Sequence, residues 1–109
     1  MTTSIDLLQG TVDVLILRAL AGEAMHGYGI SRWIRTRSSD LLAVEGAALY
    51  QALHRLERKR WVTASWGVSE NNRRAKFYAL TADGKRQLRA ESSAWKTYAA
   101  AVSTVLDPA

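Results

Sequence analysis

Residues 46–66 read GAALYQALHRLERKRWVTASW, and the spacing of their apolar residues changes midway. In the first part, apolar residues recur every three or four positions, which is the spacing of one buried helix face. They are Leu49, Ala52, Leu53 and Leu56. From Trp61 onward, β-branched and aromatic residues suited to a strand follow. We therefore expect a helix over residues 46–59, followed at once by a strand over residues 61–66.

The opposite face of this helix carries hydrogen-bonding and cationic side chains. Residues three or four positions apart share one side of a helix, so these side chains form a common surface. The members are Ala47, Tyr50, Gln51, His54 and Arg58, with Arg55 adjoining them. Such groups can bind the base edges and phosphates of a nucleic acid, although a charged helix face is often only a solvated surface.

The strand is followed by a polar loop over residues 67–74 and by a second strand over residues 75–80. Two short strands joined by a polar loop predict a β-hairpin. Its expected tip carries Arg73 and Arg74, and Lys76 lies just inside it. Because a basic hairpin tip has little structural purpose, we expect these three cations to bind an anionic partner.

Two further helices are expected upstream. Residues 10–20 have an apolar stripe at helical spacing, and residues 30–34 contain a second, shorter stripe. The first consists of Val12, Leu15, Ile16, Ala19 and Leu20, and the second of Ile30, Trp33 and Ile34. Gly27 and Gly29 indicate a turn or close packing beside the start of the second helix, which we expect to end near residues 38–40.

Trp33, Trp61 and Trp66 lie in the second helical stripe and the hairpin. Large aromatic side chains in a small domain usually bury most of their area. We therefore expect these three residues to pack in the core or against the hairpin.

A long helix is expected after the hairpin, because Thr81 is a suitable N-cap and Pro108 ends the pattern. Gly84 lowers the helix propensity of its first turn. Further along, a set of residues spaced alternately by four and three forms a helix-packing seam. The seam contains Leu88, Ser92, Trp95, Ala99, Val102 and Leu106. A seam at the end of a small domain needs a partner, so we expect it to form a dimer interface.

The composition excludes several classes of protein. The 109 residues form one small domain, and the absence of cysteine excludes disulfide scaffolds, thiolate zinc sites and cysteine nucleophiles. The two histidines have no neighbouring ligand at metal-binding spacing, and the chain lacks a glycine-rich phosphate loop or a paired acid and base. We expect no metal, no cofactor and no enzymatic activity. Without a long apolar stretch or a secretory start, we expect a cytoplasmic protein that does not enter a membrane.

The net charge of +5 is concentrated in the middle of the chain. Residues 26–76 contain ten Lys and Arg against four Asp and Glu, whereas the flanks contain five against six. The basic excess therefore coincides with the second helix, the third helix and the hairpin. This coincidence favours an anionic partner.

Three helices followed by a two-stranded hairpin is the order of a winged helix-turn-helix domain, a mainly α fold with a small β-hairpin. In that fold the third helix enters the major groove of DNA, and the hairpin, or wing, contacts the backbone or the minor groove. We expect such a DNA-binding domain over residues 1–80 and a C-terminal dimerisation helix over residues 81–109. The candidates for base edges or phosphates are Tyr50, Gln51 and His54. The candidates for phosphate are Arg55, Arg58, Arg73, Arg74 and Lys76.

Four segments resemble the PadR family of transcriptional regulators. They are LQGTVDVLIL at 8–17, MHGYGI at 25–30, ALYQALHRLE at 48–57 and ENNRRAKFYALT at 70–81, followed by Gly84. The resemblance covers nearly the whole chain, and the four motifs together are highly specific. The third segment departs from the family at Ala48, where Ser or Thr is frequent, and at Gln51, where Pro is frequent. These departures concern which bases are read and leave the expected fold unchanged.

The resemblance implies a homodimeric repressor that binds an inverted repeat in double-stranded DNA, with Tyr28 and Tyr50 among the contacts. It also implies a single C-terminal helix per chain that exchanges contacts across the dimer, as in the short-tailed branch of the family. Some members respond to small aromatic compounds bound near the dimer interface, which makes Trp95 the candidate effector contact.

A second class of function stays open at this point. A winged helix can bind a protein or an RNA through the same basic face without reading a DNA sequence. A sequence reader discriminates its site from other duplexes by several kcal/mol, whereas an adaptor would show salt-sensitive binding alone.

Overall fold

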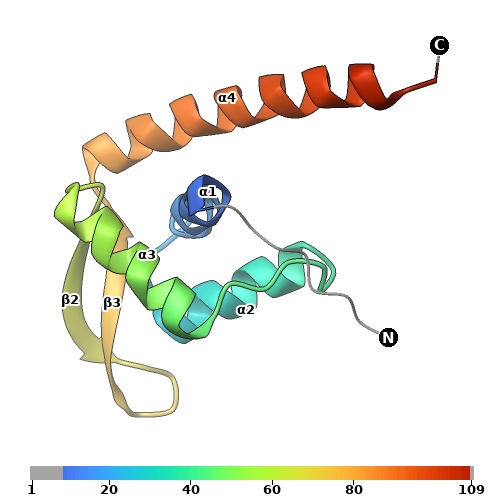
Figure 1. The fold of residues 1–109 in the computed structure, drawn as a ribbon. Helices are drawn as coiled ribbons and strands as arrows, with labels where there is room; N and C mark the ends of the chain where they lie inside the picture. Colours follow the sequence, from blue (N-terminus) through green and yellow to red (C-terminus); the bar gives the residue numbers. More distant parts are fainter. Residues whose placement is uncertain (1–8, 109) are drawn as a thin grey trace.

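The computed structural model describes residues 9–108 and has the mainly helical winged helix-turn-helix architecture expected from the sequence (Figure 1). Every predicted helix and strand is present, although the second helix begins at Gly27, three residues before the apolar stripe that predicted it. The elements are α1 (Gln9–Ala19), β1 (Met25–His26), α2 (Gly27–Arg37), α3 (Gly46–Arg58), β2 (Val62–Val68), β3 (Arg74–Leu80) and α4 (Ala82–Leu106). Leu8, the first residue of the opening motif, lies outside the described residues.

The core lies between α1, α2 and α3 and is closed by the base of the sheet. The four-residue stripe predicted on α3 is buried in full, as are Ile30 and Ile34 on α2. The largest fully buried side chains are Ile16, Leu17, Ile30, Ile34, Val44, Leu53, Leu56 and Val62. Burial of one face therefore determines which face of α3 remains free.

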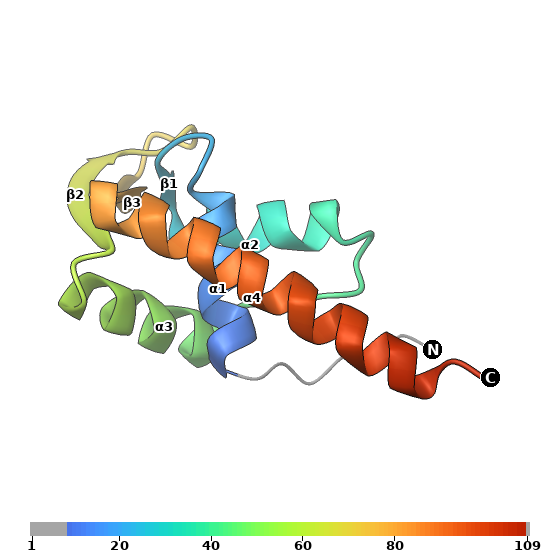
Figure 2. The same cartoon turned by 90° about the horizontal axis from the view of Figure 1, so that it is seen from above.

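The sheet contains one strand that the sequence pattern did not predict. Met25 and His26, expected as part of a turn, form β1 and pair with Tyr78 and Phe77 of β3. All pairing is antiparallel in the order β1-β3-β2, and Figure 2 shows β1 beside β3. Two residues are too few to show the alternating apolar pattern of a strand, so β1 can be recognised only by its pairing with β3. Its pairing attaches the start of α2 to the wing.

Cross-strand pairing assigns the side chains of the wing to two faces, because residues directly opposite in a sheet share a face. Val62 and Tyr78 are buried, so their face is the inner one. Further toward the tip the same face carries exposed and charged residues. The inner-face pairs are Val62 with Leu80, Ala64 with Tyr78, Trp66 with Lys76, and Val68 with Arg74.

The start of α4 is attached to the junction between α3 and β2. The Thr81 side chain caps α4 by accepting from the Gly84 amide at 3.0 Å, as predicted, and it donates to the Arg60 carbonyl at 2.7 Å. The Thr81 amide donates to the Trp61 carbonyl at 3.0 Å. A Cβ atom on Gly84 would overlap that same carbonyl oxygen. Gly84 is therefore required by close packing, and its low helix propensity is the cost of that approach.

α4 has two different halves. Near its start it contacts α1, and Leu88 packs against the chain's own core. Leu88, which the sequence pattern assigned to a dimer seam, is thus half-buried within its own chain. The second half of the helix extends past the body (Figures 1 and 2). Its large apolar side chains from Trp95 onward are exposed.

Candidate nucleic-acid interface

The free face of α3 is the one expected from its sequence. Its members are exposed on the side opposite the buried stripe. They are Ala47, Tyr50, Gln51, His54 and Arg58. The phenol of Tyr50 crosses the first residue of α2, and a Cβ atom on Gly27 would lie 2.6 Å from the Tyr50 hydroxyl oxygen. Gly27 therefore allows α2 and α3 to approach closely with Tyr50 between them.

A cleft of about 640 Å³ separates this face of α3 from the inner face of the wing. The start of α2 forms its third side. It is lined by His26 of β1, by Gly27 and Tyr28 of α2 and by Tyr50 and His54 of α3. The wing contributes Trp66, Ser69, Glu70, Asn71, Arg73, Arg74, Ala75, Lys76 and Tyr78. Most of the residues that the sequence nominated for DNA contact thus lie around one concave surface.

The start of α2 positions Tyr28 at this cleft. The His26 side chain caps the helix, because its Nδ1 accepts from the Gly29 amide at 3.0 Å. Tyr28 is largely exposed, and the Arg32 guanidinium lies 5.7 Å from its ring centroid. His26 therefore has a structural role that fixes where Tyr28 projects.

The wing presents three cations with different surroundings. Arg73 is exposed at the tip, where the turn is held by the Ser69 amide donating to the Arg73 carbonyl at 2.8 Å. Lys76 Nζ lies 3.8 Å from Glu57 Oε1 at the end of α3. The Arg74 guanidinium lies 4.6 Å from the centroid of the Trp66 ring. Trp66 is 61% exposed, so the expected packing role of this tryptophan is limited to the wing itself.

Arg55 differs from its predicted role. Its Nη2 donates to Asp13 Oδ1 at 2.8 Å, and the two side chains are only 21% and 12% exposed. An arginine paired with a carboxylate in this way has little free charge to offer a phosphate. The pair instead fixes α3 against α1. Sequence spacing placed Arg55 beside the polar face but could not reveal a partner 42 positions away.

Tyr78 forms the floor of the cleft where β3 meets α3. Burial of the phenol raises its pKa above the ordinary value of 10.0, and the nearby Glu57 and Tyr50 raise it further. The hydroxyl therefore stays protonated at neutral pH and presents no negative charge to an anionic ligand.

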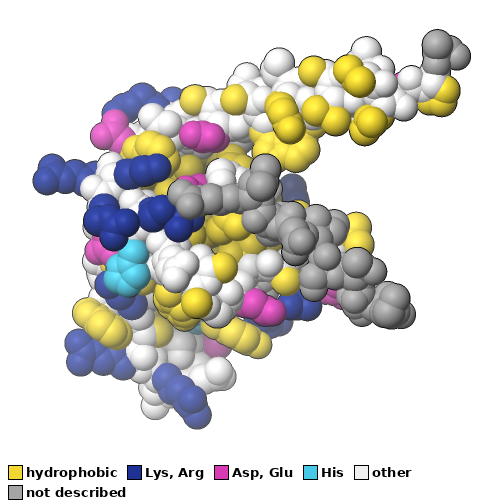
Figure 3. Space-filling model, in the orientation of Figure 1, with side chains coloured by type: hydrophobic (Ala, Val, Ile, Leu, Met, Phe, Trp, Pro, Cys, Tyr) yellow, Lys and Arg dark blue, Asp and Glu magenta, His cyan; other side chains and the backbone are white. Residues whose placement is uncertain are grey.

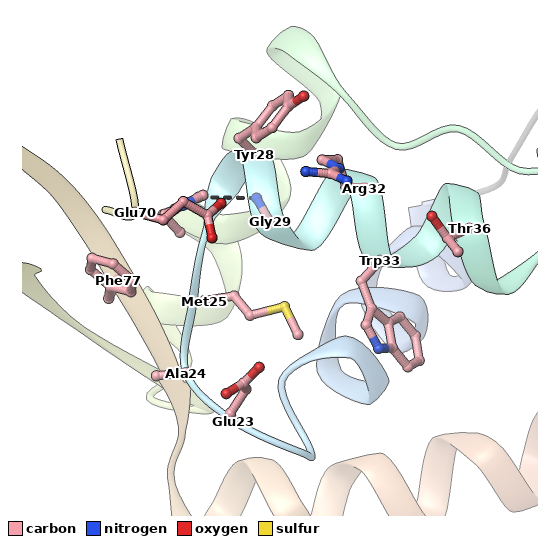
Figure 4. A pocket seen from close by; sticks show the side chains of 11 residues that line it. Glu23, Ala24, Met25, Tyr28, Gly29, Arg32, Trp33, Thr36, Glu70 and Phe77 are labelled. Atoms are coloured by element: carbon pink, nitrogen blue, oxygen red, sulfur yellow. Dashed lines mark hydrogen bonds between the residues drawn. The ribbon is translucent and has the colours of Figure 1, made fainter. Parts of the chain in front are cut away.

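A second cavity of about 460 Å³ lies on the other side of β1 (Figure 4). Met25 occupies its middle, between Phe77 and Trp33 (Figure 4). Two guanidinium groups, of Arg18 and Arg37, each lie 5.4 Å from the Trp33 ring centroid. The Phe77 ring packs against His26 and Gly67. The Trp33 and Phe77 rings of this cavity therefore already contact other side chains of the chain. Trp95 lines neither this cavity nor the cleft.

The surface shows how charge and apolar groups separate. In Figure 3 the Lys and Arg side chains gather on the side formed by α3 and the wing, and apolar side chains line the underside of α4. Within residues 9–108, no group of three or more His, Asp or Glu side chains could hold a metal ion. No helix in this range is both long and apolar enough to cross a membrane.

Comparison with known proteins supports the resemblance seen in the sequence. Residues 16–90 match the family described as "Transcriptional regulator PadR-like family". An uncharacterised protein of Lysinibacillus sphaericus is 31% identical over 90 residues, which are 83% of each chain. A transcriptional regulator of Clostridium thermocellum superposes with a TM-score of 0.81 at 26% identity, covering 91% of this chain and 96% of that one. A PadR family transcription regulator of Clostridium difficile gives 0.75 at 28%, covering 88% and 98%.

Proposed function

The chain belongs to the PadR-like family of transcriptional regulators, and we propose that it represses transcription by binding an inverted-repeat operator as a homodimer. Regulators of this family bind DNA, typically as dimers, and are not enzymes.

The cleft between α3 and the wing carries the proposal. When a winged helix binds, α3 enters the major groove and the wing reaches the backbone or adjacent minor groove, so the sugar–phosphate strand between them must run through this cleft. Gln51, His54 and Tyr50 then face base edges, with Ala47 offering an apolar contact to a thymine methyl group. Phosphates are bound by Tyr28, Arg58, Arg73 and Lys76, and Arg74 reaches the phosphates or the minor groove beside them. We omit Arg55, because Asp13 neutralises it.

The exposed half of α4 supports the homodimer. Five large apolar side chains are exposed on or beside the seam beyond Ser92. They are Trp95, Tyr98, Val102, Val105 and Leu106. A second copy of the same face would cover them and place two recognition helices about 34 Å apart, one helical turn of DNA. Because Leu88 and Gly84 belong to the body, the dimerisation element begins within α4 and not at residue 81.

The first test is selection of bound sequences from a random duplex pool at about 150 mM salt, where long-range charge effects are screened. We expect enrichment of an inverted repeat. Salt-sensitive binding without enrichment would contradict the operator and favour a winged-helix adaptor. A reporter gene placed behind the selected repeat then tests repression, because an activator would raise its expression.

The contact residues are tested by salt dependence. Replacing Arg73 and Arg74 with Ala should weaken binding to every duplex and reduce the slope of log K against log salt by about 1 for each phosphate that is no longer neutralised. The double change Arg89→Ala with Lys96→Ala removes the same charge from exposed positions on α4 and should leave the slope near that of the wild type. Equal slopes for both variants would contradict the wing assignment.

We further propose that a small planar aromatic compound releases the protein from DNA by stacking on Trp95. The indole is nearly half exposed in the middle of the apolar face of α4, where a dimer would bring two copies together. Phenolic acids and planar aromatic cations should quench the protein's fluorescence and lower operator affinity, and Trp95→Leu should abolish both effects while keeping the dimer. A compound that acts equally on Trp95→Leu would place the effector elsewhere.

A further inference from the structure

Trp66 is a large aromatic residue of the wing that lies outside the core and is mostly exposed. Its side chain is 61% exposed, whereas Tyr78, two positions closer to the body on the opposite strand, is buried. Exposing an indole to water is unfavourable, so an exposed tryptophan on a contact surface calls for a binding role. The residue stands on the inner face of the wing and lines the cleft toward α3.

Trp66 contacts a cation of the wing. The guanidinium carbon of Arg74 lies 4.6 Å from the ring centroid, well within the range of a cation–π contact. Arg74 pairs with Val68, and Trp66 with Lys76, so the contact runs diagonally across one face of the hairpin. It therefore holds the guanidinium on the inner face and toward the cleft.

Arg74 differs from the other two cations of the wing in its partners. Lys76 Nζ lies 5.8 Å from the centroid of the buried Tyr78 ring and 3.8 Å from Glu57 Oε1. Arg73 sits at the tip, and no aromatic ring among residues 9–108 lies within cation–π range of it. Within the same residues Arg74 has no carboxylate partner, so its full charge is available. An arginine side chain that is held in place loses less rotational entropy when it binds.

We propose that Trp66 is a positioning residue that holds Arg74 toward the minor groove, and that this pair makes the wing sensitive to the A·T content of the DNA beside each half-site. Stretches of A·T pairs have a narrow minor groove with enhanced negative potential, which attracts a correctly oriented arginine. The pair therefore selects DNA at positions that α3 does not reach. This inference rests on the proposed operator binding.

The test is a double-mutant cycle on two duplexes that share the selected repeat and differ in A·T or G·C pairs at the wing position. The wild type should prefer the A·T flank, and Arg74→Ala should lose that preference. Trp66→Ala should reduce the preference by about two- to fivefold, the worth of an exposed cation–π contact. The double variant should show no further loss, and Trp66→Phe should restore part of the preference.

Controls separate this role from a structural one. Val68→Ala removes another exposed apolar side chain from the same face and should keep the flank preference. Thermal unfolding of Trp66→Ala should match the wild type, because the residue lies outside the core. In protein labelled with 5-fluorotryptophan and free of DNA, Arg74→Ala should shift the fluorine resonance of Trp66 and leave that of Trp95 unchanged.

The outcomes distinguish the inference from the function beneath it. If the wild type binds a duplex with a scrambled repeat as tightly as the two test duplexes, operator binding fails and the inference fails with it. If the wild type binds the repeat but has no flank preference, or if the losses of preference from Trp66→Ala and Arg74→Ala multiply, only the inference is overturned. An unchanged flank preference in Trp66→Ala overturns it as well.

Discussion

α3 and the second half of α4 are both amphipathic helices, but they leave opposite faces exposed. α3 buries its whole apolar stripe within the chain and presents polar and cationic groups to solvent. The second half of α4 leaves apolar groups uncovered, with Tyr98 67% and Leu106 75% exposed. An exposed polar face suits a hydrated, charged ligand such as DNA, whereas an exposed apolar face is stabilised only by another apolar surface.

One amphipathic pattern can therefore suit two kinds of partner. In α3 the apolar face packs within the chain, and we propose that the polar face contacts DNA. In the second half of α4 we propose the reverse, with the exposed apolar face contacting a second copy of the chain.

The largest effect is expected from charge placed on the apolar face of α4. Val102→Glu together with Leu106→Glu would bury four carboxylates in each dimer, and each uncompensated buried charge costs several kcal/mol. Sedimentation should show a folded monomer with operator affinity greatly reduced. Ala100→Glu, an exposed change on the opposite side of the helix, should remain dimeric. Dimers in the double variant would contradict the assigned face.

The next effect compares one chemical change on the two helices. Leu53→Ala removes a fully buried side chain and should lower the free energy of unfolding by about 2–5 kcal/mol. Leu106→Ala, measured at a protein concentration low enough to give monomers, should change it by less than about 0.5 kcal/mol. At high concentration Leu106→Ala should also weaken the concentration dependence of the melting temperature. If both variants lowered the free energy of unfolding of the monomer by similar amounts, the apolar faces of α3 and α4 would not differ in burial as described.

Breaking the Asp13–Arg55 pair is expected to lower the free energy of unfolding less than truncating a core residue of α3 does, but more than breaking a surface ion pair does. Asp13→Asn should lower stability by about 1.5–3 kcal/mol, because a charge-assisted bond at a mostly buried site is weakened. Glu45→Gln breaks the more exposed pair with Arg35 and should cost at most about 1 kcal/mol. Chemical denaturation of both variants measures the difference, and equal costs would deny Arg55 its structural role.

The smallest effect concerns the tyrosine beneath α3. The pKa of Tyr78 is raised in the folded chain, so the unfolded chain loses this proton first as the pH rises through 10.0. Stability from this group is complete below that pH and declines above it, by at most about 1.4 kcal/mol per pH unit. Tyr78→Phe should lack this component, so the stability difference between the two proteins should be constant below pH 10.0 and shift above it. Parallel profiles throughout would contradict the raised pKa.

The sequence was sufficient for the helices and the hairpin because each depends on local spacing, and the family followed from the resemblance of four motifs. The buried stripe of α3 and the cap at Thr81 each depend on residues that are only a few positions apart in the sequence. The strand β1 was missed because its two residues become a strand only through β3. Helix propensity alone makes Gly84 unfavourable in the first turn of α4. A glycine is needed there because the Trp61 carbonyl packs against it, and this contact is not visible in the sequence.

Predicting the candidate site was limited by the same dependence on distant partners. The pattern found the exposed face of α3 and the cations of the wing, which share one cleft. It could not see that Asp13 engages Arg55, or that Leu88 belongs to the core. It also assigned Trp66 to packing, since the direction of a side chain on a hairpin is known only when the cross-strand register is known.

Because α4 is held at its base by the close approach of Gly84 to the Trp61 carbonyl, a small change of angle there moves the far end of the helix by a large distance. This helix has 25 residues and emerges from a point fixed to the end of α3 by Thr81. At about 1.5 Å per residue its far end lies about 37 Å away, so a tilt of about 5° at its base displaces that end by about 3 Å. Such a displacement is comparable to the rise of one base pair. The absence of a side chain at residue 84 therefore sets the angle at which α4 leaves the body of the chain.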